Sequence, residues 1–292
     1  MRIALFGKTI TEKDQPYVQR LIGKLEAIDA EIVVYEPFFK QIAPHVEFNK
    51  EGRIFNTNQD IRDGVDFLFS IGGDGTFLET LNLVRNSGIP LIGINIGRLG
   101  FLSSISKDEI GYSIDCLKNK QYSIEERTLL KLEKPAGLFG ELDYGLNEFT
   151  INRKESTSLI VIHVFVDDKF LNSYWADGLI IATPTGSTAY SLSTGGPIIT
   201  PGSENFVITP IATHNLTVRP IVIRDDSVVR IKAEGRDKSF FVSLDSRFDS
   251  IKASTELIVK KADFKINLVQ LHKKDFFTTI RDKLNWGLDK RN

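Results

Sequence analysis

Apolar residues in the first part of the chain form short continuous runs, separated by stretches in which they recur every three or four positions. Runs at residues 3–6, 32–35, 65–71 and 91–95 predict buried strands. The helical spacing predicts helices near residues 17–28, 77–86 and 107–119. Because strands alternate with helices, we expect an α/β domain built on a parallel sheet that is covered on both faces.

The pattern changes after about residue 122, where apolar and polar positions alternate. This spacing predicts strands at residues 129–132, 142–151, 159–166, 228–233, 240–244 and 256–259, in an antiparallel sheet or β-sandwich. Helical spacing returns at the end of the chain and predicts a helix that packs back on the first domain; its apolar positions are Phe276, Phe277, Ile280, Leu284 and Trp286. We therefore expect an N-terminal α/β domain, residues 1–122 with 272–292, and a C-terminal all-β domain, residues 123–271.

Charge and cysteine content narrow the classes of function. The 292 residues include 37 basic and 38 acidic side chains, so a net charge of -1 gives no overall field for capturing a nucleic acid. The single Cys116 cannot form a disulfide within the chain, and we find neither an apolar signal region nor a bilayer-length apolar run. One cysteine and four scattered histidines offer no zinc site. We expect a cytoplasmic protein without nucleic-acid or membrane partners.

The predicted strand at 65–71 runs directly into Gly72, Gly73, Asp74, Gly75 and Thr76, and a helical pattern follows. Glycines allow backbone angles closed to other residues and let a ligand approach the main chain. The N-terminus of the following helix would offer unpaired N–H groups to a phosphate. The order of strand, glycine turn and helix therefore favours a phosphate-binding turn.

Asp74 does not suit a turn that only binds anions, because a carboxylate repels phosphates. A chemical role explains it better: Asp74 could accept a proton from an attacking hydroxyl, orient that hydroxyl, or help to hold Mg²⁺ between phosphates. The alternative is that Asp74 merely caps the helix that begins near Thr76. The local spacing leaves both interpretations open.

In a second segment, residues 177–197, a short apolar strand leads into a long run of hydroxyls and glycines. Such a run offers small donors and acceptors that suit a ribose and a pyrophosphate, and Tyr190 could stack on a base. A solvated surface loop is the alternative. Upstream, Asn147 and Glu148 are polar residues within a predicted strand, where they would either pair with a ribose or lie on an exposed strand face.

Taken together, these segments resemble the NAD kinase family, whose members phosphorylate the 2′-hydroxyl of the adenosine ribose of NAD to give NADP. The resemblance extends to residues 214–223 and to the ending at 280–287. It implies a Rossmann-like N-terminal domain, a C-terminal β domain, and a homo-oligomer, either dimer or tetramer. It also implies NAD and ATP as substrates, with a divalent cation such as Mg²⁺ delivered with ATP and no metal site on the protein.

By motif match, the resemblance implies that Asp74 accepts the proton of the 2′-hydroxyl. It implies that Asn147, Glu148 and Asp177 hold a ribose. The other residues implied to bind the substrates are Gly72, Gly73, Gly75, Thr188, Ala189, Tyr190, Ser191, Leu192, Ser193 and Ala212. The chain departs from the family pattern at Asp245–Arg247, where many relatives end in Gln, and at Trp175, where some carry Arg. The roles of Trp175 and Arg247 stay open.

Two other functions remain as alternatives. A lipid or diacylglycerol-type kinase would share the glycine-aspartate turn but would need an apolar groove and a basic membrane-facing patch. A non-catalytic dinucleotide sensor would keep the fold without the chemistry. The hydroxyl run favours a polar ligand and Asp74 favours catalysis. Gly7, Lys8 and Thr9 resemble the end of a Walker A loop, but the earlier glycine of that motif would fall at Arg2, so we set it aside.

Overall fold

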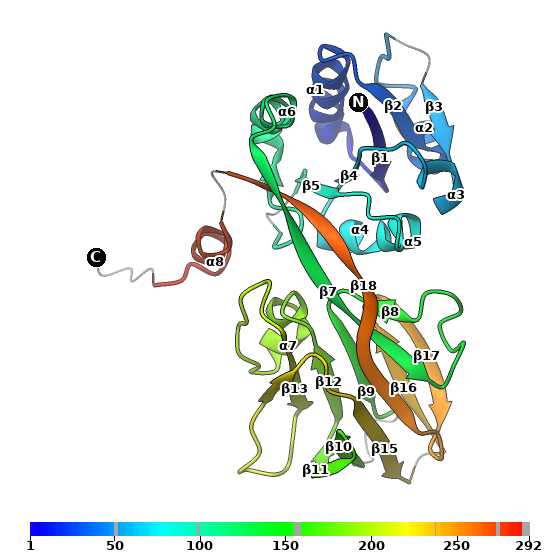
Figure 1. Cartoon of the computed structure of the whole chain (residues 1–292), viewed down its shortest axis with the longest axis vertical. Helices are drawn as coiled ribbons and strands as arrows, with labels where there is room; N and C mark the ends of the chain where they lie inside the picture. Colours follow the sequence, from blue (N-terminus) through cyan, green and yellow to red (C-terminus); the bar gives the residue numbers. More distant parts are fainter. Residues whose placement is uncertain (50–51, 98–99, 155–158, 237, 273–274, 288–292) are drawn as a thin grey trace. The chain divides into compact units, whose positions relative to one another are not determined.

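The computed structural model describes residues 1–292 except 50–51, 98–99, 155–158, 237, 273–274 and 288–292. The chain divides into two compact units (Figure 1). Unit 1 contains Met1–Glu126 and Ile266–Asn292, and unit 2 contains Arg127–Lys265. Two long strands, β7 (Tyr122–Lys134) and β18 (Leu257–Leu271), each contribute residues to both units.

Unit 1 is built on a parallel sheet with the strand order β18-β5-β4-β1-β2-β3. The register aligns Ile3 with Ile32 on one side and with Phe67 on the other, so the carboxyl ends of these strands share one edge of the sheet. A short strand, β6 (Ile105–Ser106), pairs with β5. The other strands of this sheet are β1 (Arg2–Gly7), β2 (Glu31–Tyr35), β3 (Arg53–Phe55), β4 (Phe67–Ile71) and β5 (Leu91–Asn95).

Helices cover both faces of this sheet, which confirms the predicted α/β fold. Ile3 and Leu5 pack in one cluster with Val18 and Leu21 of α1 and with Ile114 of α6. In Figure 1, α1 and α6 lie on one side of the sheet and α4 and α5 on the other. The helices are η1 (Glu12–Asp14), α1 (Gln15–Glu26), α2 (Glu36–Ile42), α3 (Asn58–Ile61), α4 (Asp74–Glu79), α5 (Leu81–Val84), η2 (Lys107–Glu109), α6 (Ile110–Lys118) and α8 (Phe276–Leu284).

Unit 2 consists of antiparallel strands in two sheets, as predicted for the all-β part. One sheet has the order β14-β13-β12-β9-β16-β17, and the other contains β11-β10-β15-β18 with β7 and β8 beside it. Alternate residues of both sheets, such as Ile151 and Ile162, form one buried cluster. The further strands are β8 (Tyr144–Gly145), β9 (Glu148–Asn152), β10 (Ile160–Val166), β11 (Lys169–Ala176), β12 (Gly178–Ala182), β13 (Asn205–Ile211), β14 (Ile221–Arg224), β15 (Val229–Gly235), β16 (Ser239–Leu244) and β17 (Arg247–Lys252).

Three sequence predictions need correction. The segment predicted as one strand at 142–151 is two strands, β8 and β9, because Leu146 and Asn147 leave the ladder between them and their N–H groups bond to the Asp245 side chain instead. The segment predicted as a strand at 256–259 is only the beginning of β18. The predicted helix at 77–86 begins earlier, at Asp74, and is divided into α4 and α5 at Thr80.

Candidate active site

The glycine turn after β4 has a backbone that only glycine adopts comfortably. Gly72 has φ 148°, and a Cβ there would lie 2.6 Å from Thr76 Oγ1. Helix α4 begins at Asp74, so the capping position is Gly73, and no side chain caps this helix. The interpretation of Asp74 as a helix cap is therefore wrong: its carboxylate is used elsewhere.

The Asp74 carboxylate binds the loop that follows β5. Oδ2 accepts a hydrogen bond from the Phe101 N–H at 2.9 Å, and Oδ1 accepts from Leu102 at 3.1 Å and from Ser103 at 2.9 Å. Gly100 makes this approach possible, because a Cβ there would lie 1.9 Å from Oδ1. The side chain is still 30% exposed, so a fixed carboxylate faces solvent at the carboxyl edge of the parallel sheet.

Helix α8 adds a cation to this carboxylate. Lys283 Nζ lies 3.5 Å from Asp74 Oδ2. The predicted helix at the end of the chain is thus present and belongs to unit 1. Lys283 was not among the predicted site residues, because its spacing from Asp74 in the sequence gives no signal of the contact.

Asn147 and Glu148 lie against the hydroxyl-rich segment in unit 2. The Thr183 N–H donates to Asn147 O at 2.9 Å, and a Cβ on Gly186 would lie 2.0 Å from that same oxygen. Because β9 pairs with β12 so that Glu148 faces Ala182, the turn after β12 must begin beside Asn147. Asn147 and Glu148 are each only 9% exposed, so the alternative of an exposed strand face is wrong.

Glu148 is a buried acid in an unusual environment. Its Oε2 is buried and has no hydrogen-bond partner. Burial, together with the neighbouring Asp245, raises the pKa of Glu148 from 4.5 to about 8, although a hydrogen bond from the Tyr190 backbone acts against this rise. An acid with an unpaired oxygen at this place is prepared for a ligand that brings hydrogen-bonding groups of its own.

Most hydroxyls of residues 183–194 stabilise the segment itself. The Thr183 hydroxyl donates to Leu146 O at 2.5 Å, and the Ser191 hydroxyl bonds to Thr209 Oγ1 at 2.9 Å. Thr183, Thr185, Ser187 and Ser191 are all buried, so the segment is not a solvated surface loop. The side chains open to a ligand are those at its surface, chiefly Tyr190, which is 42% exposed, and Ser193.

Asp177 and Ala212 lie at the other end of β12. The Asp177 N–H donates to Ile211 O at 2.9 Å, and its carboxylate pairs with Arg153 Nη2 at 2.9 Å. Ala212 follows β13 with φ 45°, a left-handed conformation that is uncommon for alanine. Since β12 spans five residues at about 3.3 Å each, roughly 16 Å separates these residues from the turn at residues 183–193. The predicted site residues of unit 2 therefore form two groups.

The departure from the family pattern at Asp245 has a structural role that the sequence did not reveal. Asp245 turns the β16–β17 hairpin with φ 52°, and its carboxylate accepts hydrogen bonds from the N–H groups of Leu146, Asn147 and Glu148 at 2.8, 2.8 and 3.1 Å. Arg247 donates to the carbonyl oxygens of Leu142 and Tyr144. Asp245 and Arg247 thus hold the segment that carries Asn147 and Glu148.

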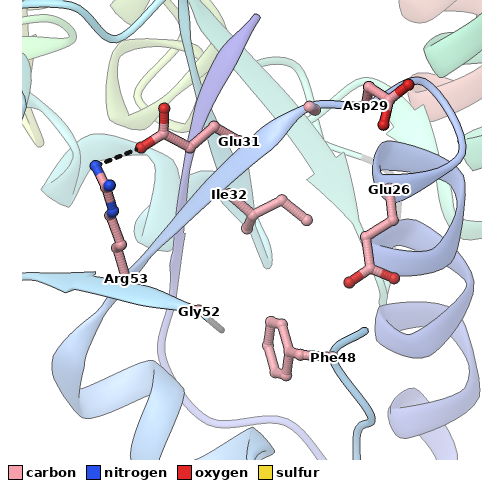
Figure 2. Close-up of a pocket in the computed structure, with 8 residues that line it drawn as sticks. Glu26, Asp29, Glu31, Ile32, Phe48, Gly52 and Arg53 are labelled. Carbon is pink, nitrogen blue, oxygen red and sulfur yellow. Dashed lines mark hydrogen bonds and ion pairs between the residues drawn. The ribbon is translucent and has the colours of Figure 1, made fainter. Parts of the chain in front are cut away.

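Two cavities of unit 1 lie at different edges of the sheet. One of about 260 Å³ is lined by Glu26, Asp29, Glu31 and Arg53, among others (Figure 2). It lies at the amino end of β2, opposite to the edge that carries Asp74, and its three carboxylates against one guanidinium disfavour an anionic ligand.

A further cavity of unit 1, of about 380 Å³, lies at the carboxyl end of β1. It is lined by Gly7 at the end of β1, by Lys8 and Thr9 of the loop that follows, and by Glu79 of α4, which forms an ion pair with Lys8. The sheet order reverses direction between β1 and β4, and ligands of open α/β sheets bind at such a reversal. The motif at Gly7–Thr9 is therefore placed beside the glycine turn, although its spacing is not that of a Walker A loop.

The described residues contain neither a candidate metal cluster nor a candidate membrane-spanning helix. No group of three or more His, Cys, Asp or Glu side chains in that part of the chain is arranged to hold a metal ion. None of its helices combines the length and apolar character that a membrane crossing requires.

Comparison with known sequences places these features in a family. A sequence model of the ATP-NAD kinase N-terminal domain matches residues 10–122, and one of the C-terminal domain matches residues 146–271. Curated relatives include the NAD kinase of Cytophaga hutchinsonii, 44% identical over 292 residues, and the NAD kinase of Bacteroides fragilis, 42% identical over 292 residues. Both alignments cover 100% of this chain and 100% of the relative.

Solved structures agree on the fold. The yeast NADH kinase complexed with NADH is 26% identical, with a TM-score of 0.86 over 99% of this chain and 89% of that chain. An NAD kinase from Archaeoglobus fulgidus in complex with ATP, 24% identical, shares the fold with a TM-score of 0.75, over 98% of this chain and 99% of that one. A parallel-sheet domain joined to an antiparallel-sheet domain is thus the architecture of a dinucleotide kinase. The chain belongs to the NAD kinase family.

Proposed function

We propose that this chain transfers the terminal phosphoryl group of ATP to the 2′-hydroxyl of the adenosine ribose of NAD and so produces NADP. Family membership supports the reaction. The observation that carries it is the Asp74 carboxylate, which three backbone N–H groups hold at the carboxyl edge of the sheet while it stays partly exposed. Binding a dinucleotide without chemistry does not require such a carboxylate.

In the proposed reaction, the 2′-oxygen attacks the γ-phosphorus while the bond from that phosphorus to the β–γ bridging oxygen breaks, and ADP leaves. Asp74 orients the hydroxyl and accepts its proton. A carboxylate is far less basic than a sugar alkoxide, so the proton moves late, and much of the benefit is positioning. The N–H groups of residues 101–103 serve this role because they prevent the carboxylate from rotating.

We assign the phosphoryl donor to the cavity after β1. Lys8 offers an ammonium group to a triphosphate, and Thr9 and Gly7 bring small polar and backbone groups to the same cavity. The cavity is lined by Gly7 of β1, which pairs with Ile71 at the end of β4, so the donor and the attacking hydroxyl would meet at the carboxyl edge of the sheet in unit 1.

A divalent cation fits this arrangement as a companion of the nucleotide. The described residues hold no three-ligand metal cluster, and Asp74 already accepts three N–H groups. Mg²⁺ is commonly held by substrate phosphates with only one or two protein carboxylates. When bound with ATP, it would be held by the substrate phosphates and would supply charge neutralisation.

In unit 2, we assign ribose contacts to Asn147 and Glu148. The Glu148 carboxyl has an unpaired buried oxygen, and the adjacent hydroxyls of a ribose both donate and accept hydrogen bonds. Thr188, Ala189, Leu192 and Ser193 would line the rest of the dinucleotide site, with Tyr190 placed to stack on a base. Ser191 would contribute through its backbone, because its hydroxyl is buried against Thr209.

We further propose that the chain acts as a homo-oligomer. Asp177 and Ala212 lie roughly 16 Å along β12 from the turn at residues 183–193. In a homo-oligomer, one copy of the chain can supply the residues at one end of β12 to a dinucleotide that is held by the turn of the other copy. Sedimentation of the purified protein would test this, and a monomer with full activity would contradict it.

We also propose a cytoplasmic location. The single cysteine, Cys116, is buried as a free thiol in α6, an environment compatible with a reducing compartment. Fractionation of cells that express the tagged chain would test this proposal, and recovery outside the cytoplasm would contradict it.

One assay tests the function. Purified protein is incubated with Mg²⁺, with ATP, another triphosphate or polyphosphate, and with NAD or NADH, and the product is detected with an NADP-specific dehydrogenase. Formation of NADP from ATP and NAD is expected. Phosphate incorporation into diacylglycerol and none into NAD would instead identify a lipid kinase, and NAD binding without NADP formation would identify a sensor.

A further inference from the structure

We propose that Lys283 of the C-terminal helix α8 is a positioning residue that acts on the reaction through Asp74. This inference rests on the proposed function, in which Asp74 orients the 2′-hydroxyl. It adds a residue from the far end of the chain, 209 positions away in sequence. Both residues belong to unit 1.

Lys283 contacts the site in two ways. Its ammonium lies 3.5 Å from Asp74 Oδ2 and 4.6 Å from the centre of the Phe101 ring. Phe101 itself donates its backbone N–H to that same Oδ2. The carboxylate and the aromatic ring therefore hold the ammonium between them, and a cation beside an aromatic face is a stabilising arrangement.

The two oxygens of Asp74 are used differently. Oδ1 accepts two N–H groups, from Leu102 and Ser103, whereas Oδ2 accepts one N–H and faces Lys283. Oδ2 is thus the oxygen with capacity left for a hydroxyl. At 3.5 Å the Lys283 ammonium attracts Oδ2 but leaves this oxygen able to accept a hydroxyl, since a tight ion pair would be about 2.8 Å. Lys283 then fixes the orientation of the oxygen that receives the hydroxyl.

Helix α8 is anchored so that Lys283 reaches this place. Asp275 caps the helix by accepting the Thr278 N–H at 2.8 Å, and the Phe276 ring lies 6.4 Å from the Phe101 ring. Lys283 lies in the last turn, where a cation also suits the helix dipole. The C-terminal helix is therefore attached to the loop that holds Asp74, at both its first and last turns.

The test is a double-mutant cycle of Lys283→Met and Asp74→Asn, with NADP formation as the readout. We expect Lys283→Met to lower kcat roughly 10-fold, while KM for NAD changes less than about twofold. Lys283→Arg, which keeps the charge, should restore most of the loss. In the Asp74→Asn background, Lys283→Met should have almost no further effect, because neighbours that act as a unit are not additive.

A matched control is Arg281→Met, which removes a cation from the same helix; Arg281 bonds to Thr278 and not to Asp74. It should leave kcat unchanged. Thermal unfolding of each variant excludes loss of folding as the cause. If Lys283→Met does not fold, Phe101→Leu replaces it, since this change keeps Lys283 and removes the ring beneath its ammonium; it should lower kcat in the same direction.

The outcomes separate this inference from the proposed function. Full activity of Lys283→Met, equal loss in Arg281→Met, or a loss that adds fully to that of Asp74→Asn would overturn the role of Lys283. If the wild-type protein forms no NADP, or if Asp74→Asn is fully active, the proposed function fails instead.

Discussion

The two carboxylates that we place at the substrate, Asp74 in unit 1 and Glu148 in unit 2, have opposite surroundings. Asp74 is partly exposed and accepts three backbone N–H groups. Glu148 is buried, has an unpaired oxygen, and has a pKa raised to about 8. Hydrogen bonds to a carboxylate favour its charged form, whereas burial disfavours it. We therefore assign the two carboxyl groups different roles. Asp74 is held in place for the reaction, and Glu148 offers an unpaired oxygen to the ligand.

Removing the reactive carboxylate should have the largest effect. Asp74→Asn keeps the shape of the side chain but loses the charge and the proton acceptor. We expect kcat to fall by about 10²–10⁴-fold, with the Kd for NAD within a few-fold of wild type. Steady-state kinetics and isothermal titration calorimetry measure these quantities. A kcat near that of the wild type would contradict the assignment of Asp74 as the reactive carboxylate.

The second largest effect is expected on stability, when the Asp245 carboxylate that holds the Glu148 segment is removed. Asp245→Ala leaves the N–H groups of Leu146, Asn147 and Glu148 without their acceptor. Because a buried unsatisfied group costs about 1–3 kcal/mol, we expect the free energy of unfolding to fall by roughly 3 kcal/mol. Asp245→Asn, which keeps one acceptor oxygen and tolerates positive φ, should lose less. Urea titration measures both, with the exposed Asp249→Ala as control; equal stability of all three variants would contradict the assignment.

The environment of Glu148 predicts a pH effect. Its pKa is about 8 in the folded chain and near 4.5 when exposed, so between these values the folded chain keeps a proton that the unfolded chain releases. Stability should therefore fall as the pH rises from about 4.5 to 8, with a slope of up to ~1.4 kcal/mol per pH unit. Asp245, whose pKa is also raised by burial, acts in the same direction.

Glu148→Gln should remove most of this slope, since an amide does not ionise in this range. Urea midpoints measured at several pH values test the prediction. An unchanged slope in the variant would assign the effect to other groups.

The smallest effect is expected at the donor cavity. Lys8→Met should raise KM for ATP by roughly 10-fold, whereas KM for NAD and the folding stability should change little. Lys8→Arg should retain most of the affinity. The control is Lys13→Met, which removes a cation of the nearby helix η1 that does not line the cavity. An equal increase in KM for NAD would contradict the assignment of Lys8 to the ATP site.

Much of the fold follows from the apolar pattern. The strands at 3–6 and 91–95 and the helix near 17–28 were predicted because buried runs and helical spacing reflect burial directly. Strand β14 was not predicted. It lies at a sheet edge with Ile221 and Val222 partly exposed, and its sequence shows no alternation of apolar and polar residues. The break between β8 and β9 depends on Asp245, about a hundred residues away, and no local pattern contains it.

The candidate site was likewise only partly predictable from the sequence. Asp74 was identifiable because a carboxylate in a glycine turn has few structural explanations, and the structure removes the capping explanation. The hydroxyls of 183–194 were predicted to face a ligand, yet several bond to other groups of the protein, inside and outside the segment, since composition does not reveal which donors are already used. Lys283 and Asp245 required the tertiary contacts, because each acts on residues far from it in sequence.

The most direct test of the account is the distance between the 2′-oxygen of bound NAD and Asp74 Oδ2 in a crystal structure of the complex. We predict a hydrogen bond of about 2.6–3.2 Å, with the N–H groups of residues 101–103 still bound to the carboxylate. A 2′-hydroxyl that bonds to another side chain, with Asp74 out of hydrogen-bonding reach, would contradict it.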